Sequence, residues 1–124
     1  MSNKIFRSNC FVIDRYMKPS TATIEVDTTK KTIEFRAAGY TVTASLDKVK
    51  ELISEYAVIG TTTMKEDTEN HTLIRYTKGI HGIPEKHVTM SLSHLDKGGV
   101  DEYMITADAD ELDKYLRAEI EKGR

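Results

Sequence analysis

Apolar and polar residues alternate along much of this chain, which is the pattern of half-buried β-strands. Segments 21–27 and 31–36 carry Thr, Glu and Arg on one face and apolar residues on the other, namely Ala22, Ile24, Val26, Ile33 and Phe35. Between them, 27–30 has the length and composition of a hairpin turn. Segment 40–44 continues the pattern with Tyr40, Val42 and Ala44 inward. The pattern predicts antiparallel strands with one solvated face.

The first predicted strand, 3–16, is apolar at both parities. Phe6, Cys10 and Val12 lie on one side, and Ile5, Phe11 and Ile13 lie on the other. Such a strand is either buried on both faces or placed at a subunit contact, which would make the protein a homodimer.

Two segments have helical periodicity instead. After Ser45, a good N-cap, the apolar stripe is Leu46, Val49, Leu52, Ile53 and Tyr56. Near the C-terminus Asp108 is the expected cap, with Glu111 completing a capping box. The stripe there is Ala109, Leu112, Tyr115, Leu116 and Ile120.

The second half repeats the order of the first, with strands expected at 58–65, 71–78, 86–94 and 100–107. The segment from Tyr40 to Ile53 aligns without a gap to Tyr103 to Leu116, 63 residues later, with four identities. Duplication explains this, although any strand–cap–helix unit follows similar rules. We predict one α+β domain over residues 1–124, with halves of about 1–60 and 61–124. Each half is a ββββα unit, forming antiparallel sheets with one helix packed per unit.

We expect a reducing, cytoplasmic location for this domain. Apolar runs stay far below the roughly 20 residues that span a bilayer, so no membrane contact is expected. The start of the chain lacks the apolar stretch of a secretory signal, and Cys10 has no second thiol to pair with. The net charge is −2, but it is unevenly divided: residues 1–62 carry +2 and residues 63–124 carry −4.

No catalytic motif is present, so the sequence predicts a binding protein and no enzyme. The Gly-x-Ser-x-Gly elbow is missing, and residues 78–82 lack the spacing of a phosphate-binding loop. The four histidines, His71, His81, His87 and His94, lack the close ligand pairs of a zinc site. We therefore expect neither a metal nor a cofactor.

Two basic–aromatic clusters each end a predicted strand. They are Arg15, Tyr16 and Lys18, and Arg75, Tyr76 and Lys78. Cations that hold phosphate beside a ring that stacks on an unpaired base suit single-stranded nucleic acid. The alternative is a half-buried pair with its polar head in water. The other surface to weigh is a Ser/Thr-rich sheet face, which is solvated, in contact with sugar and phosphate, or paired with the edge of a partner protein. It comprises Thr21, Thr23, Thr32, Thr41, Thr43, Thr89, Ser91 and Ser93, interspersed with Arg36 and His87.

The tandem ββββα order resembles the Whirly and PUR proteins and related single-stranded-DNA-binding coactivators. The strand-to-helix junction at 40–56 and the continuation 55–60 carry this resemblance. It implies that helices cover one side of the sheets while the opposite faces bind single-stranded DNA or RNA. By position, that binding face would hold Arg7, Arg15, Lys30, Lys31 and Arg36.

Three hypotheses follow from the sequence. The first is single-stranded nucleic-acid binding through a sheet face. The second is a small acidic adaptor or inhibitor of the phage or mobile-element type, which binds a basic protein. Its surface would be the acid-rich stretch 101–113, namely Asp101, Glu102, Asp108, Asp110, Glu111 and Asp113. The third is a small-molecule cleft between the halves.

Overall fold

The computed structural model describes residues 3–14, 18–59, 63–78, 87–96, 98 and 101–123. The described chain is α+β and follows the predicted order of two ββββα units. The first unit comprises β1 (Asn3–Ile13), β2 (Lys18–Asp27), β3 (Thr32–Ala37), β4 (Tyr40–Ser45) and α1 (Leu46–Ile59). The second comprises β5 (Thr63–Asp67), β6 (Thr72–Lys78), β7 (Val88–Leu95), β8 (Asp101–Asp108) and α2 (Asp110–Lys122).

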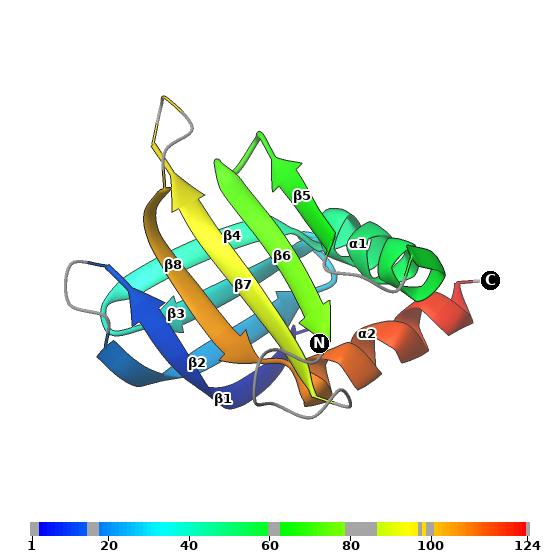
Figure 1. The fold of residues 1–124 in the computed structure, drawn as a ribbon. Coiled ribbons are helices and arrows are strands. Elements are labelled where there is room, and N and C mark those ends of the chain that lie inside the picture. The colour runs from blue at the N-terminus through cyan, green and yellow to red at the C-terminus, as the bar shows by residue number, and fades with distance from the viewer. Residues whose placement is uncertain are drawn as a thin grey trace.

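The strands form one continuous antiparallel sheet and not a separate sheet for each unit. The order is β4-β3-β2-β1-β8-β7-β6-β5, so the two units join where β1 pairs with β8. The sheet curls until β4 reaches the second unit (Figure 1). There the Ser45 N–H donates to Asp67 Oδ2 at 2.6 Å, and Thr72 Oγ1 donates to the Thr43 carbonyl at 2.6 Å. These bonds hold the sheet in a nearly closed shape.

The inner face of this curled sheet forms the core together with the two helices. All of the apolar residues predicted to face inward on β2 and β3 are buried. Leu52 and Ile53 of α1 and Leu112 and Leu116 of α2 are buried against the same core. The helices contact one another on one side of the sheet (Figure 1). No helix in the described part of the chain is long and apolar enough to cross a membrane.

The start of α1 matches the prediction, whereas its end does not. Ser45 Oγ accepts a 3.4 Å hydrogen bond from the Lys48 N–H, as an N-cap should. The helix continues to Ile59, so the expected strand from residue 58 is wrong, and β5 begins at Thr63. The sequence from 57 to 59 is Ala-Val-Ile, an apolar run too short for periodicity to separate helix from strand.

The predicted capping box of α2 is also wrong. The N-cap residue is Ala109, without a side-chain cap, and Asp108 is the exposed last residue of β8. Pairing of β8 with β7 continues to Asp108, which keeps this residue in the sheet. The first helical residue, Asp110, instead accepts a 2.6 Å bond from the Val88 N–H on β7. A long-range contact thus replaces the local cap.

The predicted polar sheet face is solvated only in part. Thr89, Ser91 and Ser93 of β7 are buried, with 7%, 7% and 3% of their surface exposed. Their side chains are small, and β7 is an interior strand that pairs with β6 on one side and β8 on the other. By contrast, β1 buries only one face in this chain, because Ile5 and Phe11 on the other are more than half exposed.

Candidate functional site

The face of the sheet turned away from the core, called here the outer face, carries a row of residues aligned across six strands. Pairing registers join Met64 of β5 to Arg75, Arg75 to Ser91, Ser91 to Thr106, Thr106 to Phe11 and Phe11 to Pro19. Because register places directly opposed residues on the same face, these side chains form one line over the sheet. The line brings together residues that are up to 95 positions apart in the sequence.

Phe11 is the most accessible aromatic ring described on this line. Its surface is 55% exposed, although a phenylalanine normally contributes to a core. Arg75 lies three strands away, roughly 14 Å along the sheet at the usual strand spacing. Its Nε contacts the Met64 sulfur at 3.4 Å, and the Met64 side chain is also 55% exposed. The outer face therefore presents a ring and a guanidinium at separate points.

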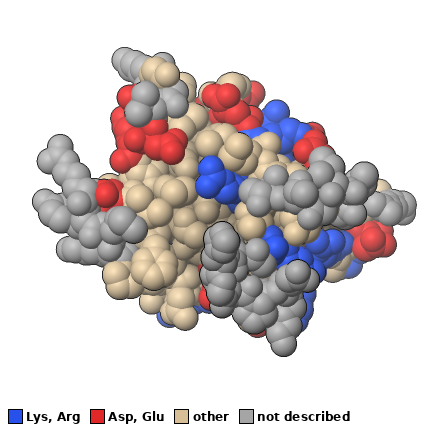
Figure 2. All heavy atoms as spheres, viewed as in Figure 1, with Lys and Arg blue, Asp and Glu red and all other residues tan. Residues whose placement is uncertain are grey.

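Between the ring and the guanidinium runs a band of hydroxyl groups. Ser91 Oγ and Thr106 Oγ1 lie 2.9 Å apart and share a hydrogen bond. Thr89 and Ser93 flank Ser91 on the same face of β7. In Figure 2, the described surface over β7, β8 and β1 is mostly free of charged residues, and acidic groups gather where β7 ends and β8 begins. This band is uncharged; Thr106 is partly exposed, whereas Thr89, Ser91 and Ser93 are buried.

The basic residues named from the sequence occupy different parts of the surface. Arg7 lies on the outer face of β1, exposed and four residues from Phe11. Arg36 is on the same face in the register row of Arg7, but it forms ion pairs with Glu34 and Glu25. Lys30 and Lys31 lie exposed in the β2–β3 turn. Arg7 and Arg75 are thus the cations best placed around the hydroxyl band.

The second basic–aromatic cluster is divided between surface and core. Arg75 and Lys78 are exposed, but Tyr76 is 0% exposed. Tyr76 lies on the inner face of β6, where its hydroxyl donates to Asp113 Oδ1 at 2.6 Å and accepts from Arg117 Nη2 at 3.1 Å. The Tyr76 ring cannot stack on a base from this position. The sequence contained the sign, since Tyr76 shares its parity with the apolar Ile74.

The first cluster falls mostly beyond what the structure describes. Arg15 and Tyr16 lie outside the described residues, as does the side chain of Lys18. In its place the outer face offers Phe11, which the sequence analysis did not select as a site residue. The apolar residues on both parities of β1 were the available signal for it.

The acidic residues of the adaptor hypothesis do not form a single patch. Asp101 and Glu102 begin β8, whereas Asp108 ends it, roughly 23 Å away at the usual rise per residue. Asp113 is only 7% exposed and is bonded to Tyr76 and Arg117. Asp110 accepts hydrogen bonds from the Val88 N–H and, at 2.8 Å, from His87 Nδ1. Glu111 is exposed on α2.

The Asp110 carboxyl group and the Cys10 thiol have pKa values shifted in opposite directions. Burial raises the pKa of Asp110, but the hydrogen bonds from His87 and Val88 outweigh it and leave the pKa below its ordinary value. Burial raises the pKa of the Cys10 thiol, which disfavours the thiolate needed for nucleophilic chemistry. Within the described residues, no three His, Cys, Asp or Glu side chains are grouped to hold a metal ion.

Comparisons with known proteins inform the fold alone. No protein-family model matches this sequence, and no curated protein matches it either. One similar solved structure is that of an SsgA-like sporulation-specific cell division protein from Thermobifida fusca. It matches over 94% of this chain and 79% of that chain, with a TM-score of 0.55 and 11% sequence identity. By fold, this chain is similar to that SsgA-like protein.

Proposed function

We propose that this protein binds single-stranded nucleic acid, without catalysis, across the outer face of β6, β7, β8 and β1. The observation that carries the proposal is the exposed Phe11 ring on the same face as Arg75 and Arg7. An unpaired base can stack on any accessible aromatic face, and guanidinium groups can hold the phosphates on either side. Of the hydroxyl band between them, Thr106 is partly exposed, and its hydroxyl suits contact with sugar and phosphate oxygens.

Charge and spacing agree with a short bound strand. The net charge of −2 gives no general attraction for a polyanion, so binding depends on local cations. Arg7 lies four residues from Phe11 along β1, or roughly 13 Å, and Arg75 lies at a similar distance from Phe11 across the strands. We therefore expect weak binding that falls as salt rises.

The composition of the outer face favours nucleic acid over a protein as the ligand. Protein interfaces are depleted in serine, and serine and threonine are rare among the residues that dominate their affinity. Here the partly exposed Thr106, with the buried Ser91 and Ser93 beside it, occupies the centre of the face. Hydroxyl groups are instead regular partners of the nucleic-acid backbone.

Fluorescence anisotropy with labelled oligo-dT and oligo-U tests the proposal. At 50 mM salt the full chain should bind both, and Phe11→Ala should weaken binding by about 1–3 kcal/mol, the usual value of one stacked base. Ile5→Ala is the matched control, since Ile5 is an equally exposed apolar residue on the same strand and face. Absence of binding at tens of micromolar protein would overturn the proposal.

A protein partner is the second candidate. Exposed Ile5, Phe11 and Met64 favour it, because apolar and aromatic side chains anchor protein interfaces. An acidic adaptor would now rely on two separated groups, Asp101 with Glu102 and Asp108 with Glu111. Purification without nuclease, followed by absorbance ratio and mass spectrometry, distinguishes the candidates by whether nucleic acid or a defined protein accompanies the chain.

The cell-division role of the similar SsgA-like protein is not part of either proposal, because 11% identity supports only the fold.

A further inference from the structure

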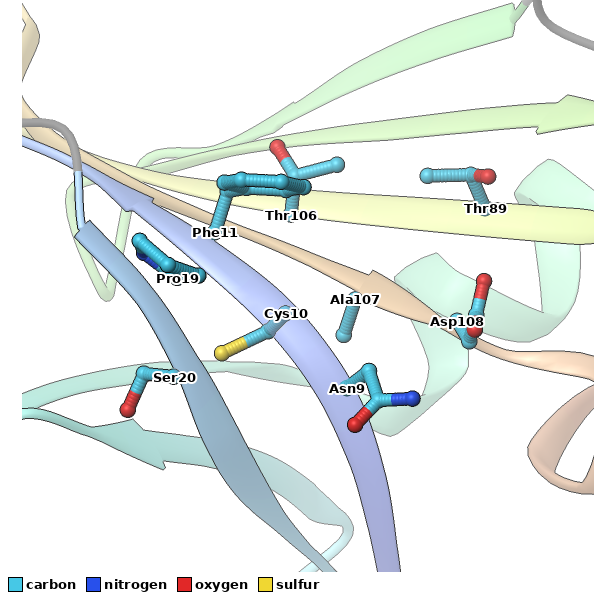
Figure 3. A pocket seen from close by; sticks show the side chains of 9 residues that line it. All are labelled: Asn9, Cys10, Phe11, Pro19, Ser20, Thr89, Thr106, Ala107 and Asp108. Atoms are coloured by element: carbon cyan, nitrogen blue, oxygen red, sulfur yellow. The ribbon is translucent and has the colours of Figure 1, made fainter. Parts of the chain in front are cut away.

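A cavity of about 460 Å³ opens on the outer face beside Phe11. Its outer-face lining comes from four strands and consists of Asn9, Phe11, Pro19, Thr89, Thr106 and Asp108. Figure 3 shows the Phe11 ring and the side chains of Thr106 and Asp108 on one side of the sheet, with the Cys10 thiol directed to the other. The cavity therefore opens on the outer face, and Cys10, Ser20 and Ala107 complete its lining.

The two ends of the cavity differ in chemistry. At one end Phe11 and Pro19 are paired across β1 and β2, so a ring and a pyrrolidine lie side by side. At the other end are Asn9 and Asp108, which are neighbours because Cys10 pairs with Ala107 in the antiparallel register. Thr89 is paired with Asp108 on the far side. A flat ligand that rests on the Phe11 ring would direct its edge toward an amide and a carboxylate.

The polar groups at that end, the Asn9 amide and the Asp108 carboxylate, are available to bind a ligand. Among the residues that the structure describes, neither the Asn9 amide nor the Asp108 carboxylate has a hydrogen-bond or ion-pair partner, and both residues are exposed. An ionised carboxylate only accepts hydrogen bonds, whereas an amide both donates and accepts. The ligand edge must therefore supply donors to Asp108, and it can supply an acceptor to Asn9.

Among the nucleobases, guanine fits this requirement best. Its Watson–Crick edge presents the O6 acceptor followed by two adjacent donors, N1–H and the N2 amino group. Adenine and cytosine each present one amino donor next to an unprotonated ring nitrogen, which a carboxylate would repel. Thymine and uracil present a single N–H between two carbonyls. Only guanine gives a carboxylate two parallel hydrogen bonds, an arrangement that is both stronger and more selective than one.

We propose that this cavity is a guanine subsite, in which the base stacks on Phe11 while Asp108 accepts from N1–H and N2–H and the Asn9 amide donates to O6. The inference rests on the proposed function and adds a base preference to it. The rest of the outer face, with its hydroxyl band and two arginines, holds the backbone and is indifferent to sequence. The protein then binds many single strands but prefers those with an accessible guanine.

The test uses labelled dT10 oligonucleotides with one central guanine, inosine or adenine, and fluorescence anisotropy with the full chain. Guanine should bind roughly tenfold more tightly than adenine, as expected for one good bidentate contact. Inosine lacks only the N2 amino group, so it should fall between them. Asp108→Asn should abolish the preference for guanine over adenine, while the loss of one negative charge should slightly raise affinity for plain dT10.

Asp101→Asn is the matched control for the loss of one negative charge. Asp101 is an exposed acid at the opposite end of β8, so its variant should raise affinity for every oligonucleotide slightly and keep the preference for guanine. Equal affinity for guanine, inosine and adenine would overturn the guanine subsite and leave the proposed function standing. A guanine preference that survives in Asp108→Asn would also overturn it. If none of the oligonucleotides binds, the proposed function itself fails.

Discussion

The rings of Tyr40 and Tyr103 contact each other, with centroids 4.5 Å apart and planes tilted by 38°. They occupy equivalent positions in the two ββββα units, one at the start of β4 and the other early in β8. The Tyr103 hydroxyl also donates to the backbone carbonyl of Thr41, next to Tyr40. The first residue of the sequence repeat in each half therefore contacts its counterpart and links the two halves.

This contact predicts energetic coupling between the two tyrosines. In a double-mutant cycle of Tyr40→Leu and Tyr103→Leu, the coupling should be about 0.5–1.5 kcal/mol, the usual value of an aromatic pair beyond its buried area. Urea unfolding followed by circular dichroism measures it. The variant Tyr103→Phe keeps the ring and loses the hydrogen bond to Thr41, so it should cost about 1 kcal/mol. Strict additivity in the cycle would show that the rings stabilise the halves independently.

The buried Tyr76 and Asp113, together with the partly exposed Arg117, link β6 to α2 and predict a larger loss of stability. Tyr76→Phe removes the donor to Asp113 Oδ1, and Arg117 Nε, 2.9 Å from Oδ2, would remain as the carboxylate's partner. Because Asp113 is buried, the free energy of unfolding should fall by roughly 1–3 kcal/mol. Chemical denaturation tests this, with Glu111→Gln on the exposed side of α2 expected to change little. An unchanged Tyr76→Phe variant would mean that Arg117 alone satisfies the carboxylate.

The same group changes how the acidic-adaptor hypothesis can be tested. Reversing the charge of Asp113 would place a cation in the core beside Arg117, so lost binding would report unfolding and not a lost contact. Glu111 and Asp101 are suitable positions, because both are exposed. A pull-down that survives Glu111→Lys combined with Asp101→Lys would count against an acidic binding surface.

The strands and helix faces could be predicted from the sequence because local burial dictates them. Alternation on β2 and β3 identified the inward residues, and Ser45 marked the start of α1. What could not be predicted depends on contacts between distant segments. The bond from the Ser45 N–H to Asp67, which helps to close the sheet, joins residues 22 positions apart. The bond between Val88 and Asp110, which replaces the expected cap of α2, spans the same separation.

In the candidate site, too, some residues could be predicted from the sequence and others could not. Arg75 could be selected from the sequence because a cation on the strand face opposite the apolar Ile74 is exposed in most arrangements. Phe11 could not, since an aromatic residue in an apolar strand is normally expected in the core. Its exposure follows from the pairing of β1 with β8, which determines the face on which odd-numbered residues of β1 lie. Asn9 and Asp108 likewise become neighbours only through that pairing.

The lowered pKa of Asp110 predicts a loss of stability in acid. A carboxyl group whose pKa is lower in the folded state than in the unfolded state stabilises the fold above its ordinary pKa of 3.8. That contribution disappears as the pH falls from about 4 through the lower folded-state value. Asp110→Asn should therefore be less stable than the native chain at pH 7, by roughly 1 kcal/mol given its partial exposure. The difference should shrink between pH 4 and pH 2.5.

Urea unfolding at pH 7, 5, 4 and 2.5 measures this difference directly. His87→Ala removes one of the two donors to Asp110 and should show a smaller effect of the same sign, because the Val88 N–H still binds the carboxylate. A difference between Asp110→Asn and the native chain that stays constant down to pH 2.5 would contradict the assignment.

We expect the salt dependence of oligonucleotide binding to distinguish the role of the arginines from that of the Phe11 ring. Each phosphate neutralised on a single strand contributes about −0.7 to the slope of log Kobs against log salt concentration. Arg7→Ala and Arg75→Ala should each reduce the magnitude of that slope by about 0.7. Phe11→Ala should lower affinity at every salt concentration and leave the slope unchanged, since stacking releases no counterions. Arg36→Ala should change the slope less than either, because Arg36 is already paired with Glu34 and Glu25. A slope that depends on Arg36 but not on Arg7 or Arg75 would move the binding face to β3 and β2, away from the hydroxyl band.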